Sequence, residues 1–369
     1  DHNGSRGLGD VYKRQGYLSC FSFCVFDGSG LTNLYDHSLN RSRPIKRFFQ
    51  GRMEIVFFIH RFTIFNLFHI LAYSNIKILI AVSIKKYSEP TLNVGMIVAK
   101  AFGAKTTIVD IGEKINPFSL KEVGIAQERM DSWNIDRPGV DVLEWAFDFL
   151  AQNKFIKKND IEAGFPKNTL IERDGRRSEV FLKGTVCDDV SLILRNGEII
   201  EELIDEVRTE GYDVTIIGKS TNSKKDYELS QFIDSSIFIV NNYDSSKNYK
   251  ILLPIDDSPG MKKAVKYSAR IARAFEVGVE LILVNKSNEI HQNNQSALNW
   301  AEKFLRRFNI NFLVMIEKGE TVEVITNKAS INHIIIMGSS SSGALKTFIA
   351  GNKPLRVLKN SQSPILIVK

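Results

Sequence analysis

The sequence predicts an α/β fold made of two doubly wound domains, each with a five-stranded parallel sheet between layers of helices. Two observations predict it. The chain repeats itself once, and duplicated sequence indicates duplicated fold. Its strongest apolar segments are continuous runs bounded by turn residues, which is typical of strands buried on both faces. With 369 residues, of which 43% are hydrophobic and 25% charged, the chain has room for two such domains.

The first half of the repeated unit carries the clearest match. Residues 75–83 (NIKILIAVS) resemble residues 248–256 (NYKILLPID). At the same offset, residues 99–102 (AKAF) resemble residues 272–275 (ARAF). Each copy then continues into a second apolar strand, so the pattern is strand, helix, strand and predicts parallel pairing. These second strands are predicted at 106–111 and 279–284.

The later part of the unit repeats too. Residues 190–218 and 312–338 both read as a strand, a glycine, an amphipathic helix and a short strand that ends in glycine. A last strand closes each copy, at 235–240 and at 364–368. Each copy therefore has five predicted strands with alternating helices.

The domain boundaries follow from the repeat. The first domain is predicted over 75–241 and the second over 249–369, with a polar linker (NNYDSSKN) at 241–248. The first domain contains an insertion at about 112–189, for which we expect a helix over 140–155 and a hairpin-like stretch around Asp174-Gly175.

Residues 1–74 precede the repeated part and do not share its pattern. The string GLGDVYKRQ at 7–15 resembles read-through sequence in metagenome-derived proteins, so we treat the extension as partly artefactual or disordered. The segment 53–73 is rich in Phe, Ile and Leu and long enough to span a bilayer, but Glu54, His60, Arg61, Asn66 and His69 interrupt it. A membrane anchor is the alternative to translated upstream sequence, and we expect no membrane association.

The charge balance argues against nucleic acid as a partner. Nine of the 49 Lys and Arg residues and five of the 42 Asp and Glu residues lie in residues 1–74. The rest of the chain therefore holds 40 basic and 37 acidic residues, which is no basic footprint. Cys20, Cys24 and Cys187 form neither a disulfide framework nor a zinc pattern, so we expect a reducing cytoplasm and no structural metal.

Three segments of the second copy carry a family resemblance, namely ILLPIDDS (251–258), MGSSSSGALKTFIAGN (337–352) and PLRVLKNSQSPILIVK (354–369). They resemble the universal stress protein family, and the two copies together resemble its tandem form, with a Rossmann-like, adenine nucleotide α-hydrolase-like fold. The family's ATP pattern is Gly, two residues, Gly, nine residues, Gly, then Ser or Thr. Gly338 and Gly351 fit its first and third glycines, whereas Ser341 and Asn352 replace the second glycine and the Ser/Thr.

The resemblance implies that ATP or another adenine nucleotide binds in the second domain. A loop that leaves a parallel strand at Gly338 and enters a helix near Asn352 also suits phosphate on physical grounds, because backbone N–H groups and the helix dipole face it. Asp256 is placed to accept hydrogen bonds from adenine or ribose, although it could instead only cap the next helix. The predicted nucleotide-binding residues are Ile255, Asp256, Val284, Met337, Gly338, Ser341, Gly343, Gly351 and Asn352.

The first domain departs from the family pattern. Ser83 stands where the second copy has Asp256, and the stretch after Gly218 has lysines (Lys219, Lys224 and Lys225) in place of the later glycines. We interpret this domain as a degenerate partner with a structural role. The last strands of both copies are short, apolar and uncharged, so we expect them to pair as an intramolecular pseudo-dimer, with further homodimerisation also open.

No catalytic constellation accompanies the fold. His333 begins a predicted strand and reads as a core histidine, and GxSxG, HExxH, CxxC and a full Walker A string are absent from the sequence. We therefore expect no enzyme, with at most slow incidental ATP hydrolysis. The expected function is an adenine-nucleotide-responsive regulatory module of the stress response, in the cytoplasm, with an unknown protein partner.

Three alternatives stay open. The chain could be the cytoplasmic regulatory tail of a membrane transporter, or a stress protein that binds no nucleotide and serves as a structural or interaction module. An enzyme of the wider adenine nucleotide α-hydrolase-like group is the third, and it would need a complete phosphate loop and a substrate pocket.

Overall fold

The computed structural model describes residues 76–83, 85–112, 139–165, 171–173, 177–185, 187, 189–219, 223–285, 291–329, 332–339 and 353–369. All of them lie in one compact unit, residues 64–369. The predicted extension 1–74 lies outside the described residues.

Five parallel strands form the sheet of the first half. Their spatial order is β5-β2-β1-β6-β7. The first strand is therefore central, the second and third strands extend the sheet on one side, and the fourth and fifth extend it on the other. The strands are β1 (Lys77–Val82), β2 (Lys105–Gly112), β5 (Val190–Asn196), β6 (Val214–Gly218) and β7 (Ser236–Val240).

The second half has the same arrangement. Its parallel strands lie in the order β10-β9-β8-β11-β12, which is again third, second, first, fourth and fifth along the chain. The two five-stranded parallel sheets predicted from the repeat are confirmed. The strands are β8 (Lys250–Ile255), β9 (Val279–Asn285), β10 (Phe312–Lys318), β11 (His333–Gly338) and β12 (Ile365–Val368).

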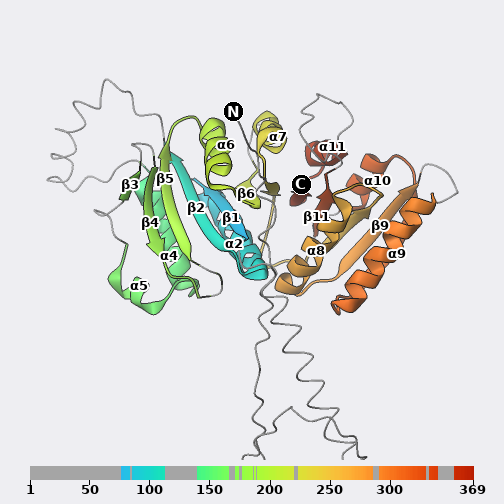
Figure 1. The fold of residues 1–369 in the computed structure, drawn as a ribbon, viewed down its shortest axis with the longest axis horizontal. Coiled ribbons are helices and arrows are strands. Elements are labelled where there is room, and N and C mark those ends of the chain that lie inside the picture. The colour runs from blue at the N-terminus through green and yellow to red at the C-terminus, as the bar shows by residue number, and fades with distance from the viewer. Residues whose placement is uncertain are drawn as a thin grey trace, which may run out of the picture. The chain divides into compact units, whose positions relative to one another are not determined.

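Helices cover both faces of the strands, as Figure 1 shows. One apolar cluster joins α2, α4, α8 and α9 to one face, and a second cluster joins α6, α7, α10 and α11 to the other. Because the central strands are buried on both sides, their residues form largely uninterrupted apolar runs instead of alternating ones. The helices are α2 (Lys85–Phe102), α4 (Val140–Gln152), α5 (Lys158–Ala163), α6 (Ile199–Glu210), α7 (Ser223–Phe232), α8 (Met261–Phe275), α9 (Gln292–Arg307), α10 (Thr321–Lys328) and α11 (Lys353–Asn360).

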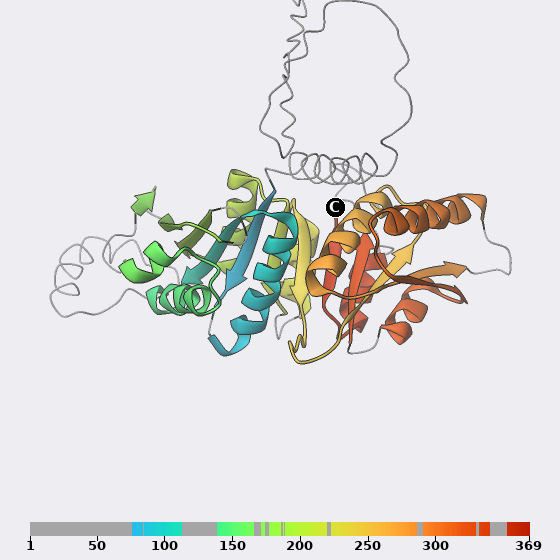
Figure 2. The ribbon, with the colours of Figure 1, turned by 90° about the horizontal axis from the view of Figure 1, so that it is seen from below.

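The two halves join through their last strands, as the sequence predicts. β7 and β12 pair antiparallel, with Phe238 opposite Leu366, and this pairing makes one twelve-stranded sheet from the two parallel ones. Next to it, α2 and α8 lie side by side (Figure 2). The rings of Phe102 and Tyr267 meet edge to face there, with centroids 4.8 Å apart. Each last strand is thereby covered and offers no open edge.

The insertion extends the sheet of the first half. The predicted hairpin is confirmed as β3 (Ile171–Arg173) and β4 (Arg177–Leu182), which pair antiparallel. β4 also pairs antiparallel with β5 and so covers that edge. The predicted helix over 140–155 is α4, which ends at Gln152 because Asn153 and Lys154 leave the helical path, Lys154 with a φ of 57°.

The predicted linker at 241–248 is anchored at both ends by aromatic packing. Tyr243 and Tyr249 stack with their ring centroids 5.0 Å apart, and Phe275 packs edge to face on Tyr243. Between the two tyrosines, Asp244 accepts a hydrogen bond from the backbone N–H of Ser246 at 3.0 Å. The segment is therefore a structured turn in addition to being polar.

Candidate functional site

The strand order fixes where each half can hold a ligand. β8 lies between β9 and β11 in the sheet. Helix α8, which follows β8, lies on one face of the sheet, and helix α10, which precedes β11, lies on the other. The crevice outside the carboxyl ends of β8 and β11 is therefore the switch point at which open α/β sheets bind ligands. In the first half, the equivalent place lies between β1 and β6.

Asp256 stands at this place in the second half. It directly follows β8, and its Oδ1 accepts a hydrogen bond from the backbone N–H of Ser258 at 3.0 Å. The carbonyl of Ser258 accepts in turn from the N–H of Met261, the first residue of α8. Asp256 thus shapes the turn into α8, which was the alternative reading of this residue. A carboxylate has acceptor positions to spare, so this role leaves room for a ligand.

Gly338 ends β11 beside the start of α8. A Cβ atom at Gly338 would lie 2.5 Å from the backbone carbon of Gly260, and one at Gly260 would lie 2.7 Å from the backbone nitrogen of Ser339. The N–H of Ser339 donates to the carbonyl of Val368 at 2.7 Å. Only glycine allows two backbone segments to come this close, so the exit from β11 is held against the first turn of α8.

The remaining predicted residues fall into two groups. Val284 and Met337 pack on the face covered by α10 and α11, whereas the side chain of Ile255 belongs to the cluster on the opposite face. The structure therefore puts Val284 and Met337 on the same face of the sheet and Ile255 on the other. Four predicted residues lie outside the described part of the chain, namely Ser341, Gly343, Gly351 and Asn352.

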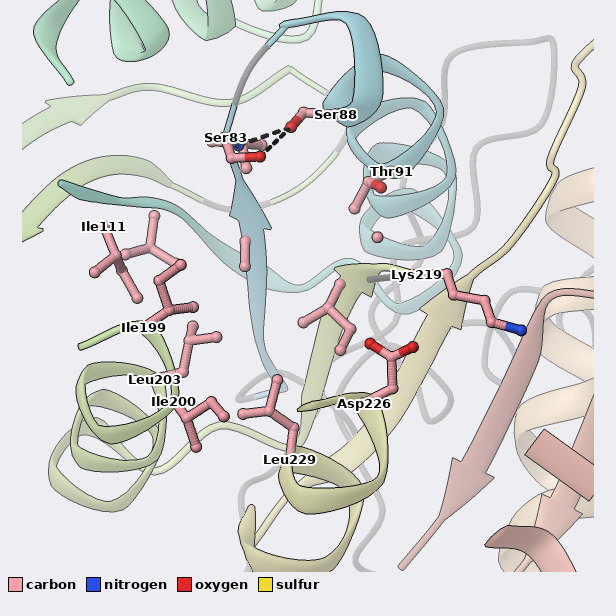
Figure 3. Close-up of a pocket in the computed structure, with 15 residues that line it drawn as sticks. Ser83, Ser88, Thr91, Ile111, Ile199, Ile200, Leu203, Lys219, Asp226 and Leu229 are labelled. Atoms are coloured by element: carbon pink, nitrogen blue, oxygen red, sulfur yellow. Dashed lines mark hydrogen bonds between the residues drawn. The ribbon is translucent and has the colours of Figure 1, made fainter. Parts of the chain in front are cut away.

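In the first half, the switch point contains a cavity of about 270 Å³. It is open to solvent at the carboxyl ends of β1, β2 and β6, and α2, α6 and α7 complete its walls (Figure 3). Most of its lining is apolar, with Ile111, Ile200, Leu203 and Leu229 among the wall residues. The half that we interpreted as degenerate from its sequence has therefore kept a hollow at the ligand-binding place of the fold.

The polar lining of this cavity differs from the predicted site of the second half. Ser83 replaces Asp256, and its backbone N–H donates to Oγ of Ser88 at 2.7 Å. The hydroxyl-bearing side chain of Thr91 is also buried in the wall, at 1% exposure. Hydroxyl groups thus line the side of the cavity that α2 forms.

Asp226 lies on the opposite side, in the first turn of α7, and is 2% exposed. A helix N-terminus attracts anions, and here the protein's own carboxylate lies at that end. α11, the counterpart of α7 in the second half, has no acidic residue in its first turn and begins with Lys353. In the first half, the N-terminus of α7 therefore already has a carboxylate where a phosphate group could bind, whereas the first turn of α11 in the second half has none.

The sequence did not point to Thr91, Ser88 or Asp226. After Gly218 it drew attention to the lysines, and the structure shows that Lys219 donates its Nζ hydrogen bond across the junction, to the carbonyl of Ser361 at 3.3 Å. An acidic residue in the first turn of a predicted helix was the signal that could have identified Asp226.

The one histidine of the second half that the sequence assigned to the core has a partner. Nε2 of His333 lies 3.1 Å from Oε2 of Glu280, and Lys250 lies 2.7 Å from the other carboxylate oxygen. Burial raises the pKa of Glu280, but the hydrogen bonds from Lys250 and His333 outweigh burial and hold the pKa below its usual value. His333 is therefore a satisfied structural residue, as expected.

Fold and site together define a class, the doubly wound α/β proteins of Rossmann type with a ligand crevice at the switch point of each half. Comparison with known proteins narrows this class. Residues 248–369 match the model of the Universal stress protein family. The second half of the chain is therefore a domain of this family.

One curated relative and two solved structures illustrate the similarity. The protein is 26% identical over 140 residues to Universal stress protein MJ0531 of Methanocaldococcus jannaschii, a match that covers 32% of this chain and 81% of that protein. The crystal structure of a universal stress protein from Archaeoglobus fulgidus DSM 4304 has a TM-score of 0.51 at 16% identity, and covers 79% of this chain and 96% of that one. A second Archaeoglobus fulgidus universal stress protein, solved in complex with dAMP, covers 33% of this chain and 98% of that one at 16% identity and a TM-score of 0.27.

In the residues that the structure describes, no helix combines the length and the apolar character needed to cross a membrane. The apolar segment 53–73, which is long enough to span a bilayer, lies outside those residues. Within the same described ranges, no three His, Cys, Asp or Glu side chains are grouped as a metal site would require.

Proposed function

We propose that this protein binds an adenine nucleotide in the crevice of its second half and acts in the stress response as a nucleotide-responsive binding module of the cytoplasm. In this proposal the activity is binding and not catalysis. The first half is a degenerate copy of the same domain, and it supports the second half through the β7–β12 junction.

The observation that carries the proposal is the placement of Asp256 and Gly338 at the ends of neighbouring strands, at the switch point of the second half. A carboxylate there can accept hydrogen bonds from an adenine amino group or from ribose hydroxyl groups. Gly338 has no side chain between the crevice and the backbone of α8.

The contrast between α7 and α11 supports the choice of the second half. A phosphate group near α7 would meet the carboxylate of Asp226, whereas the first turn of α11 has no acidic residue and starts with the basic Lys353. Like charges at close range in a partly buried crevice repel each other, so triphosphate binding is favoured at α11. We therefore expect one nucleotide per chain.

Isothermal titration of the full-length protein with ATP tests this proposal. The wild type should bind one ATP, and Asp256→Ala should weaken binding about 10- to 100-fold, because one or two hydrogen bonds to a charged acceptor are lost. Asp257→Ala is the matched control, since Asp257 is the exposed neighbouring residue. Asp226→Ala, in the other half, should leave the affinity unchanged.

Two results would refute the assignment. Wild-type protein that releases no heat with ATP would exclude the site, and ATP binding that is lost in Asp226→Ala but kept in Asp256→Ala would place it in the first half. Measurement of ADP release under the same conditions tests the second part of the proposal. Sustained turnover would contradict a role limited to binding.

A further inference from the structure

The twelve-stranded sheet has two end strands, the short β3 of the insertion and, at the other end, β10. β10 is the last strand at this end, and among the described residues its one neighbouring strand is β9. Leu313 and Ile316 of β10 are 57% and 53% exposed. A strand edge with free N–H and C=O groups and exposed large apolar side chains readily pairs with another strand.

The chain shows how it covers edges of this kind. Its two five-stranded parallel sheets have four edge strands, and three of them are paired antiparallel within the chain. β4 covers β5, while β7 and β12 cover each other. β10 occupies in the second half the position that β5 has in the first, but no described strand lies beside it.

The second half has no counterpart of the insertion that supplies β4. Between β9 and β10 the structure describes α9, and this helix packs against β8 and β9, on the face of the sheet, through Ala297, Leu298 and Ala301. No described strand therefore covers the outer edge of β10. The β7–β12 junction is a pairing of corresponding strands from two similar units, which suggests a second copy of the chain.

We propose that β10 pairs antiparallel with β10 of a second copy, so that the protein forms a two-fold homodimer with a sheet that continues from one chain into the other. Such a pairing is closed, because each β10 covers the other, and the joined sheet would end at the β3 strand of each chain. This proposal does not depend on nucleotide binding.

The sequence of β10 favours the antiparallel direction. Its two charged residues, Glu317 and Lys318, lie at the same end of the strand. In a parallel pairing each of them would lie beside its own copy, whereas an antiparallel pairing centred on Met315 separates the like charges and puts Val314 opposite the partner subunit's Ile316. Apolar cross-strand pairs stabilise a sheet, and like charges side by side destabilise it.

The oligomeric state of the full-length protein in solution tests this proposal. Sedimentation velocity at about 1 to 100 µM should show a reversible monomer–dimer equilibrium for the wild type. Leu313→Glu and Ile316→Lys should each raise the dimer dissociation constant about tenfold or more. In this register Leu313 lies opposite the partner subunit's Glu317 and Ile316 belongs to an apolar pair, and a two-fold interface contains every substitution twice. Both positions are exposed, so these variants should keep the thermal stability of the wild-type monomer.

Phe181→Lys is the matched control, because Phe181 is an equally large apolar residue, 50% exposed, on β4 at the other end of the sheet. It should leave the dimer unchanged. A wild-type chain that stays monomeric over the whole concentration range overturns the proposal. So does a dimer that Leu313→Glu and Ile316→Lys leave intact, or one that Phe181→Lys disrupts equally.

Discussion

Gly260 and Gly338 come from opposite sides of the predicted nucleotide crevice and meet backbone to backbone. A Cβ atom added to Gly338 would lie 2.5 Å from the carbonyl carbon of Gly260 and 2.7 Å from the nitrogen of Met261. Both neighbours are backbone atoms of the turn into α8, so neither can move aside by changing a rotamer. The contact thus joins the end of β11 to the start of α8.

Gly338→Ala should therefore destabilise the protein by about 1 to 3 kcal/mol, the usual cost of inserting a carbon atom into well-packed structure. Urea unfolding followed by circular dichroism measures this change. Gly278→Ala is the control, because a Cβ atom there would make an ordinary contact of 3.5 Å with the carbonyl of Asn311. Equal losses in the two variants would show that the approach of Gly260 and Gly338 is not tight.

A buried carboxyl group should make stability depend on pH. Asp110, near the end of β2, is 5% exposed and faces the start of α4, close to Gly139. Burial raises the pKa of Asp110 to about 7, and the negative charge of Asp141 adds to this effect. The folded protein therefore binds a proton that the unfolded chain releases near pH 4.

Because the folded pKa is raised, stability should fall as pH rises from about 4 to about 7, by about 4 kcal/mol from this group, and then level off. Asp110→Asn should remove this part of the pH dependence and make the protein more stable than the wild type at pH 8. Chemical denaturation at several pH values between 5 and 8 checks it. Asp141→Asn is a control that should keep most of the slope, and parallel stability curves for Asp110→Asn and wild type would contradict the prediction.

A buried ion network attaches the inserted hairpin to the core. Glu206 of α6 is fully buried and accepts hydrogen bonds from Arg195 at 2.6 Å, Tyr212 at 2.9 Å and Arg177 at 3.3 Å. Arg177 is in β4 and also pairs with Glu179. Glu206 thus connects the strand that covers the edge of the first half with the helix above it.

Glu206→Gln should destabilise the protein by about 3 to 5 kcal/mol, since it removes one partner of a buried ion pair and leaves two arginines short of a carboxylate. Thermal or urea unfolding measures this loss. Hydrogen exchange should show its largest increase in β4. Glu201→Gln, at an exposed position of the same helix, is the matched control and should change stability by about 0.5 kcal/mol or less.

The junction of the two halves depends on Phe238. This side chain is fully buried in β7, opposite Leu366 of β12. Phe238→Ala should cost about 3 to 5 kcal/mol, through lost burial and the cavity left behind. Phe181→Ala removes a half-exposed phenylalanine and should cost far less, so similar losses would show that the junction is loosely packed. Unfolding with urea distinguishes the two results.

Much of the fold could be predicted from particular segments. The match of residues 75–83 to residues 248–256 identified corresponding first strands, and Asp174-Gly175 indicated the hairpin that the structure places at β3 and β4. The uncharged last strands predicted their own pairing. These features depend on local apolar runs, turn residues and an internal repeat, all of which can be identified in a single sequence.

The candidate sites could be predicted only in part. Asp256 and Gly338 were found because both follow apolar runs at strand ends. The cavity of the first half was missed, since Thr91, Leu203 and Asp226 come from three helices far apart in the chain. The side chains of Ile255 and Val284 lie on opposite faces of the sheet, which the sequence did not predict. Both residues belong to strands that are apolar on both faces, so the apolar pattern does not show which face each side chain is on.

The sequence by itself determined the repeated order of strands and helices, the site of the insertion and the residues at the strand ends. Tertiary structure alone decided that the two parallel sheets become one, that β4 covers β5 while β10 has no described cover, and that a hollow remains in the half without the nucleotide motif. The physical reason is that local patterns fix which segments are buried. Edges, cavities and ion networks arise instead from how distant segments pack, and no single segment contains that information.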